Sequence, residues 1–163
     1  MKKFELTSES IANIFGKRLF RIKALIEFGN VKEGELGGFV EKEENLSHEG
    51  NAWVYGNARV YGDARVYGDA WVSGNAWVSG NAEVYGDARV YGDADYATVK
   101  GFGTEYRTTT FFKCKDGILR VRCGCFYGDL EEFRNQVKNT RKGKIAKEYL
   151  MIANLMEKHF KEV

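Results

Sequence analysis

Two histidines are the side chains in this chain best suited to acid–base catalysis. They are His48 and His159, and an imidazole can serve as the general base of an acyl transfer. Glu44 and Glu49 lie close enough to His48 in the sequence to orient its ring. His159 falls in the last turn of an expected helix, where a charged imidazole is favoured. His48 is therefore the single candidate base, and a capping or surface position is the simpler interpretation of this side chain.

Three cysteines could ligate a metal ion. Cys114, Cys123 and Cys125 fall on two expected facing strands of a hairpin, and Cys123 and Cys125 share a face because side chains alternate along a strand. A structural zinc site needs four ligands and usually a Cys-x2-Cys spacing, which this segment lacks. We therefore expect buried free thiols, no metal site and no cofactor.

Basic residues accumulate towards the C-terminus. From residue 134 to residue 161 the chain holds eight lysines and arginines against Glu148 and Glu157. The candidate contact residues among them are Arg134, Lys138, Arg141, Lys142 and Lys144. Such a segment could contact phosphate or an acidic partner, but a solvated helix face is the simpler interpretation. Because the formal net charge of the whole chain is only +2, nucleic acid is not expected as a partner.

The bulk composition limits the class of protein. A chain of 163 residues corresponds to roughly one domain. No run of about 18 apolar residues occurs, so no membrane span is expected. The N-terminal sequence MKKFELTSES is not followed by the apolar stretch of a secretory signal. The sequence therefore predicts a cytoplasmic protein without a membrane partner.

A six-residue repeat must position these side chains. Glycine recurs at every sixth position from 50 to 92, each time followed by Asn or Asp and then by Ala, and seven complete units carry Val two residues after the Ala. Ala and Val alternate with two variable positions, which is the pattern of a very short strand with one apolar face. Gly-Asn and Gly-Asp are turn sequences, because both residues tolerate a positive φ. The chain is thus expected to form a strand, turn a corner and repeat.

The repeat resembles the hexapeptide repeat of left-handed parallel β-helices. In that family three hexads form one triangular coil of about 18 residues, with the aliphatic residue inside. The resemblance implies that residues 18 apart stack about 4.8 Å from each other on adjacent coils. Three outward columns are then expected. The first holds Trp53, Trp71 and Arg89, with Tyr55 and Tyr91 beside them. The second holds Arg59 and Trp77, and the third holds Arg65 and Glu83.

Aromatic and arginine side chains dominate these outward columns. The candidate surface comprises Trp53, Tyr55, Trp71, Arg89, Tyr91, Trp77 and Arg59. Exposed aromatic area of this density is typical of an interface. Because hexapeptide β-helices commonly trimerise along a face, contact between the subunits of a homo-oligomer, most simply a trimer, is the favoured interpretation. Direct contact with a ligand or a partner protein is the alternative, with the Trp53–Trp71 face first in line.

Both ends of so short a β-helix need caps. Residues 3–6, 18–25 and 36–40 predict three strands before the repeat. Residues 106–114 and 118–123 predict a hairpin after it, followed by a helix that Asp129 caps and a second helix from about residue 144 to 160. The predicted fold is mainly β: an N-terminal β cap (residues 1–47), a short left-handed parallel β-helix (48–97) and a C-terminal ββαα module (98–163).

A more specific resemblance concerns the flanking segments. Residues 16–25 and 34–47, which lead into the Gly-Asn-Ala hexads, resemble hexapeptide-repeat proteins that phages and prophages often encode and that often carry the label transferase. Residues 123–133 also look like a module of phage proteins. The transferase label rests on fold analogy, and the family offers no catalytic residue to transfer.

The function that this resemblance implies is a non-enzymatic binding protein. It would counteract a host defence by sequestering a nucleotide signal or by blocking a host factor. Two alternatives stay open: an acyltransferase-like enzyme that uses acyl-CoA with His48 as its base, and a purely structural oligomer. The chain holds no P-loop or dinucleotide-binding motif, because its glycines follow the six-residue period of the corners.

Overall fold

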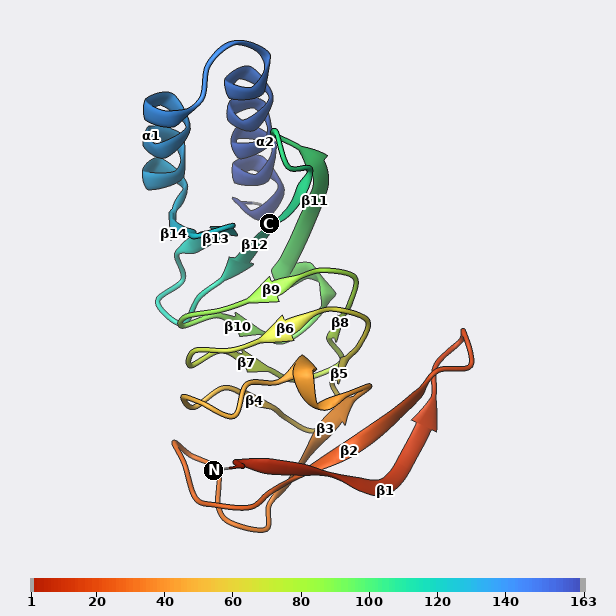
Figure 1. Ribbon diagram of the computed structural model, residues 1–163. Coiled ribbons are helices and arrows are strands. Elements are labelled where there is room, and N and C mark those ends of the chain that lie inside the picture. The colour runs from red at the N-terminus through yellow and green to blue at the C-terminus, as the bar shows by residue number, and fades with distance from the viewer. Residues whose placement is uncertain (1, 162–163) are drawn as a thin grey trace.

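The computed structural model describes residues 2–161 as a stack of short-stranded coils between two end modules (Figure 1). The N-terminal strands are β1 (Phe4–Ala12), β2 (Arg18–Ala24) and β3 (Leu36–Val40). The coil strands are β4 (Trp53–Val54), β5 (Arg59–Val60), β6 (Arg65–Val66), β7 (Trp71–Val72), β8 (Trp77–Val78), β9 (Glu83–Val84) and β10 (Arg89–Val90). The C-terminal elements are β11 (Tyr96–Phe102), β12 (Arg107–Lys113), β13 (Leu119–Cys123), β14 (Phe126–Asp129), α1 (Leu130–Thr140) and α2 (Gly143–Lys161).

Successive coils pair in parallel with the predicted offset of 18 residues. Trp53 pairs with Trp71, which pairs with Arg89. Arg59 pairs with Trp77, and Arg65 with Glu83, so the expected stacking of these residues on adjacent coils is confirmed. We name the three sides after one residue each. The Trp71 face contains β4, β7 and β10, the Trp77 face contains β3, β5 and β8, and the Glu83 face contains β6 and β9.

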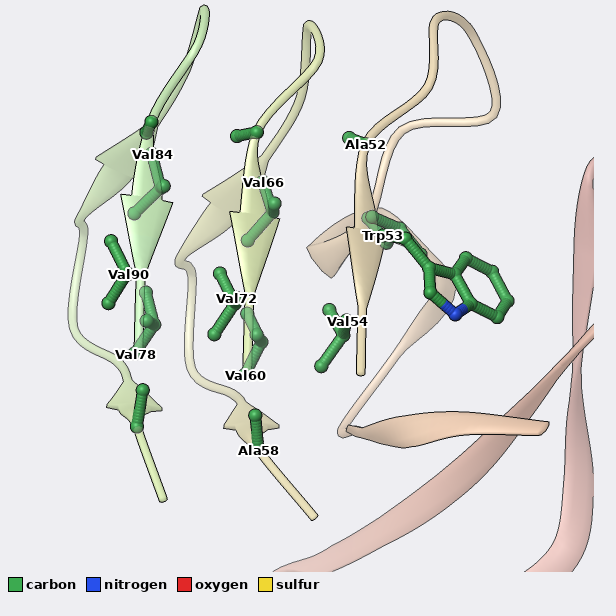
Figure 2. Packing of buried hydrophobic residues seen from close by; sticks show 14 of the residues in the cluster. Ala52, Trp53, Val54, Ala58, Val60, Val66, Val72, Val78, Val84 and Val90 are labelled. Carbon is green, nitrogen blue, oxygen red and sulfur yellow. The ribbon is translucent and has the colours of Figure 1, made fainter. Parts of the chain in front are cut away.

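The inside of the coils is filled by the repeat's alanines and valines. The seven valines from Val54 to Val90 and the seven alanines from Ala52 to Ala88 are all 0% exposed. Figure 2 shows these side chains gathered on one side of their strands, with the Trp53 ring pointing the other way. Each buried valine stabilises the fold by roughly 1.5–3 kcal/mol relative to exposure, so the inward positions supply the cohesion of the stack.

Only one residue of each Gly-Asn or Gly-Asp corner adopts a left-handed conformation. The seven corner glycines from Gly50 to Gly86 have positive φ. Tyr106 is the sole non-glycine residue with positive φ among residues 2–161. The glycine of each pair therefore takes the left-handed conformation, and the Asn or Asp does not. The Asn or Asp side chain can instead accept a hydrogen bond from the neighbouring coil. Asp69 Oδ1, for example, accepts the backbone N–H of Asn51 at 3.2 Å.

The first coil is irregular and begins before the repeat. Val40 in β3 pairs with Val60, and Leu46 bridges to Val66, so the offset here is 20 residues. Leu46 thereby takes the inward place next to Val66, which the 18-residue offset of the later coils would have given to His48. A 3-10 turn at Glu43–Asn45 accommodates the two additional residues.

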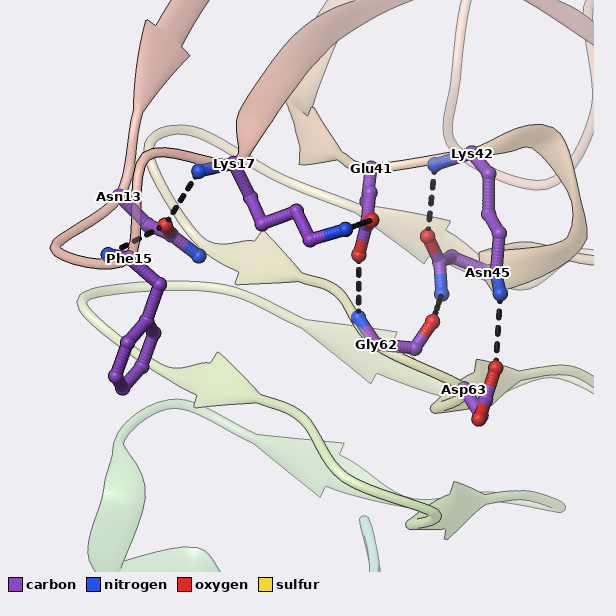
Figure 3. Close-up of polar contacts among 8 residues, drawn as sticks. All are labelled: Asn13, Phe15, Lys17, Glu41, Lys42, Asn45, Gly62 and Asp63. Carbon is purple, nitrogen blue, oxygen red and sulfur yellow. Dashed lines mark hydrogen bonds and ion pairs between the residues drawn. The ribbon is translucent and has the colours of Figure 1, made fainter.

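Donor side chains close the N-terminal end of the stack, where backbone carbonyls face outward. Lys3 Nζ donates to the carbonyls of Gly50 and Ala52 at 3.3 and 2.7 Å. Arg21 donates to the carbonyl of Gly56 at 3.2 Å. The buried amide of Asn45 donates to the carbonyls of Gly62 and Ala64 at 3.2 and 2.8 Å, the first of which is drawn in Figure 3. These donors replace the N–H groups of the coil that is missing at this end.

Acceptor side chains close the opposite end, where N–H groups face outward. Asp93 Oδ1 accepts the N–H of Trp77 at 2.8 Å, and Asp95 Oδ2 accepts that of Tyr91 at 2.8 Å. Thr110 Oγ1 in β12 accepts the N–H of Glu83 at 3.0 Å. Each end also exposes the other kind of group, because successive residues of a strand direct their backbone groups alternately to the two neighbouring strands. The Gly62 N–H donates to Glu41 Oε1 at 2.8 Å at the N-terminal end, and the Trp77 carbonyl accepts the Tyr96 hydroxyl at 2.6 Å at this end.

The C-terminal module has four strands rather than the two predicted. The sheet order is β11-β12-β13-β14, all antiparallel. The predicted hairpin corresponds to β12 and β13, whereas β11 begins in the degraded eighth hexad and β14 is too short to show alternation. Asp129 caps α1 as predicted, accepting the N–H of Glu132 at 2.8 Å. Both helices pack on this sheet around Phe111, Phe133, Tyr149 and Ala153. Within residues 2–161, neither helix has the length and apolar character needed to cross a membrane.

Candidate interaction surface

The Trp71 face carries a column of stacked aromatic and guanidinium groups. Tyr55 meets Trp71 edge-on, with ring centroids 5.2 Å apart. The Arg89 guanidinium lies 4.0 Å from the Trp71 ring centroid. Arg89 Nη1 also donates to the carbonyls of Asp69 and Ala88, each at 3.0 Å, which fixes the guanidinium on the ring. Tyr91 stands beside the column and is 56% exposed. The column is therefore preorganised, with each of its three members half-buried.

Trp53 does not belong to this surface, contrary to the sequence prediction. Its side chain is 0% exposed. Phe28 and Phe4 meet its ring edge-on at centroid distances of 5.3 and 6.3 Å. The N-terminal module passes over the first coil of the Trp71 face and buries the indole. An aromatic side chain buries about 150–250 Å² in this way, so Trp53 attaches the cap to the stack.

A cavity of about 190 Å³ lies beside the Arg89–Trp71 pair. Its lining combines both charges: the carboxylates of Asp69 and Asp87 with the cations Arg89 and Lys115. Asn51, Asp69 and Asp87 share one corner of the stack because they are 18 residues apart. Asn30 reaches the same cavity from the N-terminal module.

The Trp77 face repeats the aromatic–guanidinium motif on a smaller scale. The Arg59 guanidinium lies 4.8 Å from the Trp77 ring centroid, and Trp77 is 37% exposed. The Tyr96 hydroxyl donates to the backbone carbonyl of Trp77 at 2.6 Å, so the start of the C-terminal module borders this face. Arg59 and Trp77 thus stand together, as the 18-residue spacing predicted, but without a second aromatic ring stacked on the pair.

The Glu83 face is occupied by the C-terminal module. Tyr67 donates its hydroxyl to Glu83 Oε1 at 3.1 Å, and Arg122 Nε lies 3.5 Å from the same oxygen. The Arg122 guanidinium covers the Tyr85 ring at 4.6 Å. Burial, reinforced by the Glu83 charge, raises the pKa of Tyr67 to about 12. These contacts join β13 to the stack and leave Arg65 as the exposed residue of this face.

His48 is positioned as a cap and lacks a free basic nitrogen. Its Nδ1 accepts the backbone N–H of Lys3 at 3.0 Å, and its ring stacks on Phe4 at 4.3 Å. The proton of the neutral ring is then on Nε2, which lies 3.6 Å from Glu43 Oε2. A cavity of about 230 Å³ lined by Glu43, Ser47, Arg65 and Tyr67 adjoins the ring. A general base needs an unoccupied lone pair facing its substrate, and neither nitrogen provides one.

The cysteines differ in exposure more than the sequence suggested. Cys114 is buried, Cys123 is half-buried and Cys125 is exposed, and all three are free thiols. Cys125 lies in the turn after β13, so it does not share a strand face with Cys123. Among residues 2–161, no three His, Cys, Asp or Glu side chains come close enough together to hold a metal ion.

The predicted basic segment is split by the structure. Lys138, Arg141, Lys142 and Lys144 are exposed around the connection between α1 and α2. Arg134 is different, because its side chain is only 15% exposed and bonds Glu131, Glu157 and Asn154. Arg134 therefore joins the two helices, and its inclusion among the free basic residues was wrong.

Several neighbours of the Arg89 column were missed by the sequence interpretation. Asp69 and Asp87 could have been found, since the 18-residue spacing that stacks the tryptophans also stacks these corners. Asn30 and Lys115 come from the two end modules, where no repeat relates sequence distance to spatial distance. The same limit explains why Trp53 was assigned to the surface.

A comparison with family models is consistent with this geometry. A model of the YdcK β-solenoid repeat matches residues 52–68, 58–74 and 64–80. The coils are a β-solenoid. The match covers the repeat alone, so it describes the scaffold and leaves the end modules and the surface columns uncharacterised. No curated protein matches the sequence.

Proposed function

We propose that this chain is a non-enzymatic interaction protein that binds a partner protein through the Trp71 face. The observation that carries the proposal is the Tyr55–Trp71–Arg89 column, which is fixed in place yet open to solvent. Trp, Tyr and Arg are the residues that most often dominate binding energy at protein interfaces. Because the column is already ordered, little conformational entropy is lost on docking.

A protein fits this surface better than a nucleotide does. The adjoining cavity of about 190 Å³ is smaller than the roughly 300–1,000 Å³ of typical small-molecule sites. The carboxylates of Asp69 and Asp87 offset the cations Arg89 and Lys115 in its lining, so the cavity offers phosphate groups no net positive charge. Of the two counter-defence roles, blocking a host protein is thus favoured over sequestering a nucleotide signal. Acyl transfer has less support, because the one lone pair of a neutral His48 ring, on Nδ1, already accepts the backbone N–H of Lys3.

The proposal includes the features that the resemblance to phage-type hexapeptide proteins implies. These are a left-handed sense of the coils, a phage origin, a cytoplasmic location in the host and assembly into a homo-oligomer, most simply a trimer. The Trp77 face, with Arg59 on Trp77, is the second candidate surface for a partner.

The test compares partner binding by matched variants. Cross-linked complexes from host cytoplasm would identify the partner, and calorimetry with the purified proteins would give Kd. Trp71→Ala and Arg89→Ala should each weaken binding by about 30-fold or more, the loss typical of a central interface residue. Arg65→Ala is the control, because this exposed arginine lies on another face, and its Kd should equal that of the wild type.

Three results would contradict the proposal. Unchanged affinity in Trp71→Ala would remove the column from the interface. Saturable binding of a cyclic dinucleotide that Arg89→Ala abolishes would favour sequestration. An acetyl-CoA-dependent activity that His48→Ala abolishes would show an enzyme.

A further inference from the structure

The hairpin between β1 and β2 presents two large apolar side chains at its tip. Ile14 is 81% exposed and Phe15 is 76% exposed. The tip is nevertheless ordered, because Asn13 Oδ1 accepts the backbone N–H groups of Phe15 at 2.9 Å and Lys17 at 3.0 Å. Figure 3 shows this arrangement, with the Phe15 ring directed away from the contacts that anchor the turn. A fixed apolar projection of this kind loses little entropy on docking.

Cations flank the apolar pair. Lys17 is paired with Glu41 at 3.7 Å, yet its side chain remains 65% exposed. Arg18 is exposed at the start of β2. Residues 13–18, which we call the hairpin tip, contain no carboxylate. The surface that fits this tip is an apolar recess with a rim of carboxylates.

The same chain carries such a recess at its other end. A cavity of about 280 Å³ between the β12–β13 turn and the two helices has Ile118, Leu119 and Leu130 as its apolar lining. Its carboxylates are those of Asp129, Glu131 and Glu157. Arg134 also lines it and pairs with Glu131 and Glu157, so the lining holds three carboxylates against one guanidinium and keeps a net negative charge. Ile118 is 45% exposed, so the apolar lining is open to a ligand. We call this cavity the acidic recess.

We propose that the hairpin tip of one copy inserts into the acidic recess of a second copy of this chain. The proposal rests on the homo-oligomer of the proposed function and names its contact. Figure 1 places the tip and the start of α1 on opposite sides of the molecule, so a chain cannot fill its own recess. Two different surfaces then meet, and such a head-to-tail contact closes into a ring or continues as a chain of subunits. A ring of three satisfies every tip and every recess.

Sedimentation velocity of the full-length protein tests this contact. The wild type should sediment as an oligomer. Phe15→Ser, which alters the tip, and Ile118→Ser, which alters the recess, should each yield monomers. Both residues are exposed, so the thermal midpoint of each variant at low protein concentration should equal that of the wild type. Met151→Ser is the matched control, since Met151 is 69% exposed on α2 but lies outside both surfaces, and it should leave the oligomer intact.

Mixing the two defective variants identifies the head-to-tail geometry. Phe15→Ser retains a recess and Ile118→Ser retains a tip, so one sound contact can form between them. An equimolar mixture should therefore form a one-to-one heterodimer and nothing larger. Raised salt should weaken this heterodimer, because Lys17 and Arg18 face carboxylates in the complex.

The outcomes separate this contact from the rest of the proposed function. An oligomer that persists in Phe15→Ser overturns the contact but leaves the homo-oligomer of the proposed function in place. If that oligomer is lost in Trp71→Ala, the subunit interface lies on the Trp71 face instead. A wild type that is monomeric at all concentrations overturns both the contact and the homo-oligomer. If Phe15→Ser leaves the oligomer intact but abolishes binding of the host partner, the tip serves that partner and the contact between copies is refuted.

Discussion

At the scale of single residues, the ends of the solenoid are closed by side chains whose hydrogen-bonding character matches the exposed backbone. Lys3 is the most demanding of these, because its ammonium group is buried against Phe28 and two carbonyls. Burial lowers the pKa of Lys3 to about 8, against the opposing effect of Asp69. The neutral amine can still donate to both carbonyls, so deprotonation keeps the cap while relieving the desolvation of the charge.

The lowered pKa of Lys3 predicts the pH dependence of stability. Between about pH 8 and pH 10.5 the unfolded chain holds a proton on this side chain that the folded chain has lost. The free energy of unfolding should therefore gain a contribution that rises with pH across this window. Urea unfolding at several pH values would measure it as the difference between the wild type and Lys3→Gln. Lys23→Gln, at an exposed lysine, is the control, and its difference in the free energy of unfolding from the wild type should not change with pH. If the difference for Lys3→Gln is also independent of pH, the Lys3 amine is not desolvated.

At the scale of the elements, each coil depends on corners that bring consecutive strands close together. The corner glycines combine a left-handed backbone with proximity to the next coil, and the two requirements can be separated. Gly74 and Gly80 have φ of 64° and 68°. A Cβ at Gly74 would meet the carbonyl oxygen of Tyr91, whereas a Cβ at Gly80 would find no atom within 4 Å.

This pair predicts two sizes of destabilisation. Gly80→Ala should lower the free energy of unfolding by about 1–2 kcal/mol, the cost of a left-handed conformation for an L-residue. Gly74→Ala should cost more, because the methyl group also displaces the backbone of the neighbouring coil. Chemical denaturation of both variants measures the difference. Equal losses at the two positions would mean that the stack adjusts freely at this corner.

At the scale of the whole molecule, β12 joins the two hydrophobic cores. Phe112 is 0% exposed and belongs to the solenoid core, while its neighbour Phe111 is 0% exposed and belongs to the core of the helices. Adjacent residues on a strand face opposite sides, so this one strand closes the last coil and supports α1 and α2 at once. The solenoid and the C-terminal module are therefore expected to unfold together.

Removing one side of this connection should uncouple the two parts. Phe112→Ala should destabilise the protein by about 3–5 kcal/mol, the cost of truncating a buried phenylalanine. Tryptophan fluorescence reports the solenoid, which holds all three tryptophans, and circular dichroism at 222 nm reports mainly the helices. In the wild type the two thermal transitions should coincide, and in Phe112→Ala the fluorescence transition should come first. Coincident transitions in the variant would show that another contact couples the cores.

The repeat made much of the scaffold predictable. A strict six-residue period ties sequence distance to spatial distance, so the pairing of Trp71 with Arg89 and of Arg65 with Glu83 followed from position alone. The inward valines and the Asp129 cap were predictable for a similar reason, because alternation and capping are local rules.

The tertiary structure decided which side chains reach solvent, and with that the candidate sites. Trp53 and Trp71 occupy the same repeat position, but the N-terminal module covers only the first of them. His48 became a cap because Lys3 and Phe4, more than 40 residues away, pack against it. The sequence by itself determined the coils, since each unit interacts with its periodic neighbours. The exposure of each face depended on how the two end modules pack against the coils. That packing is long-range, and no local sequence pattern encodes it.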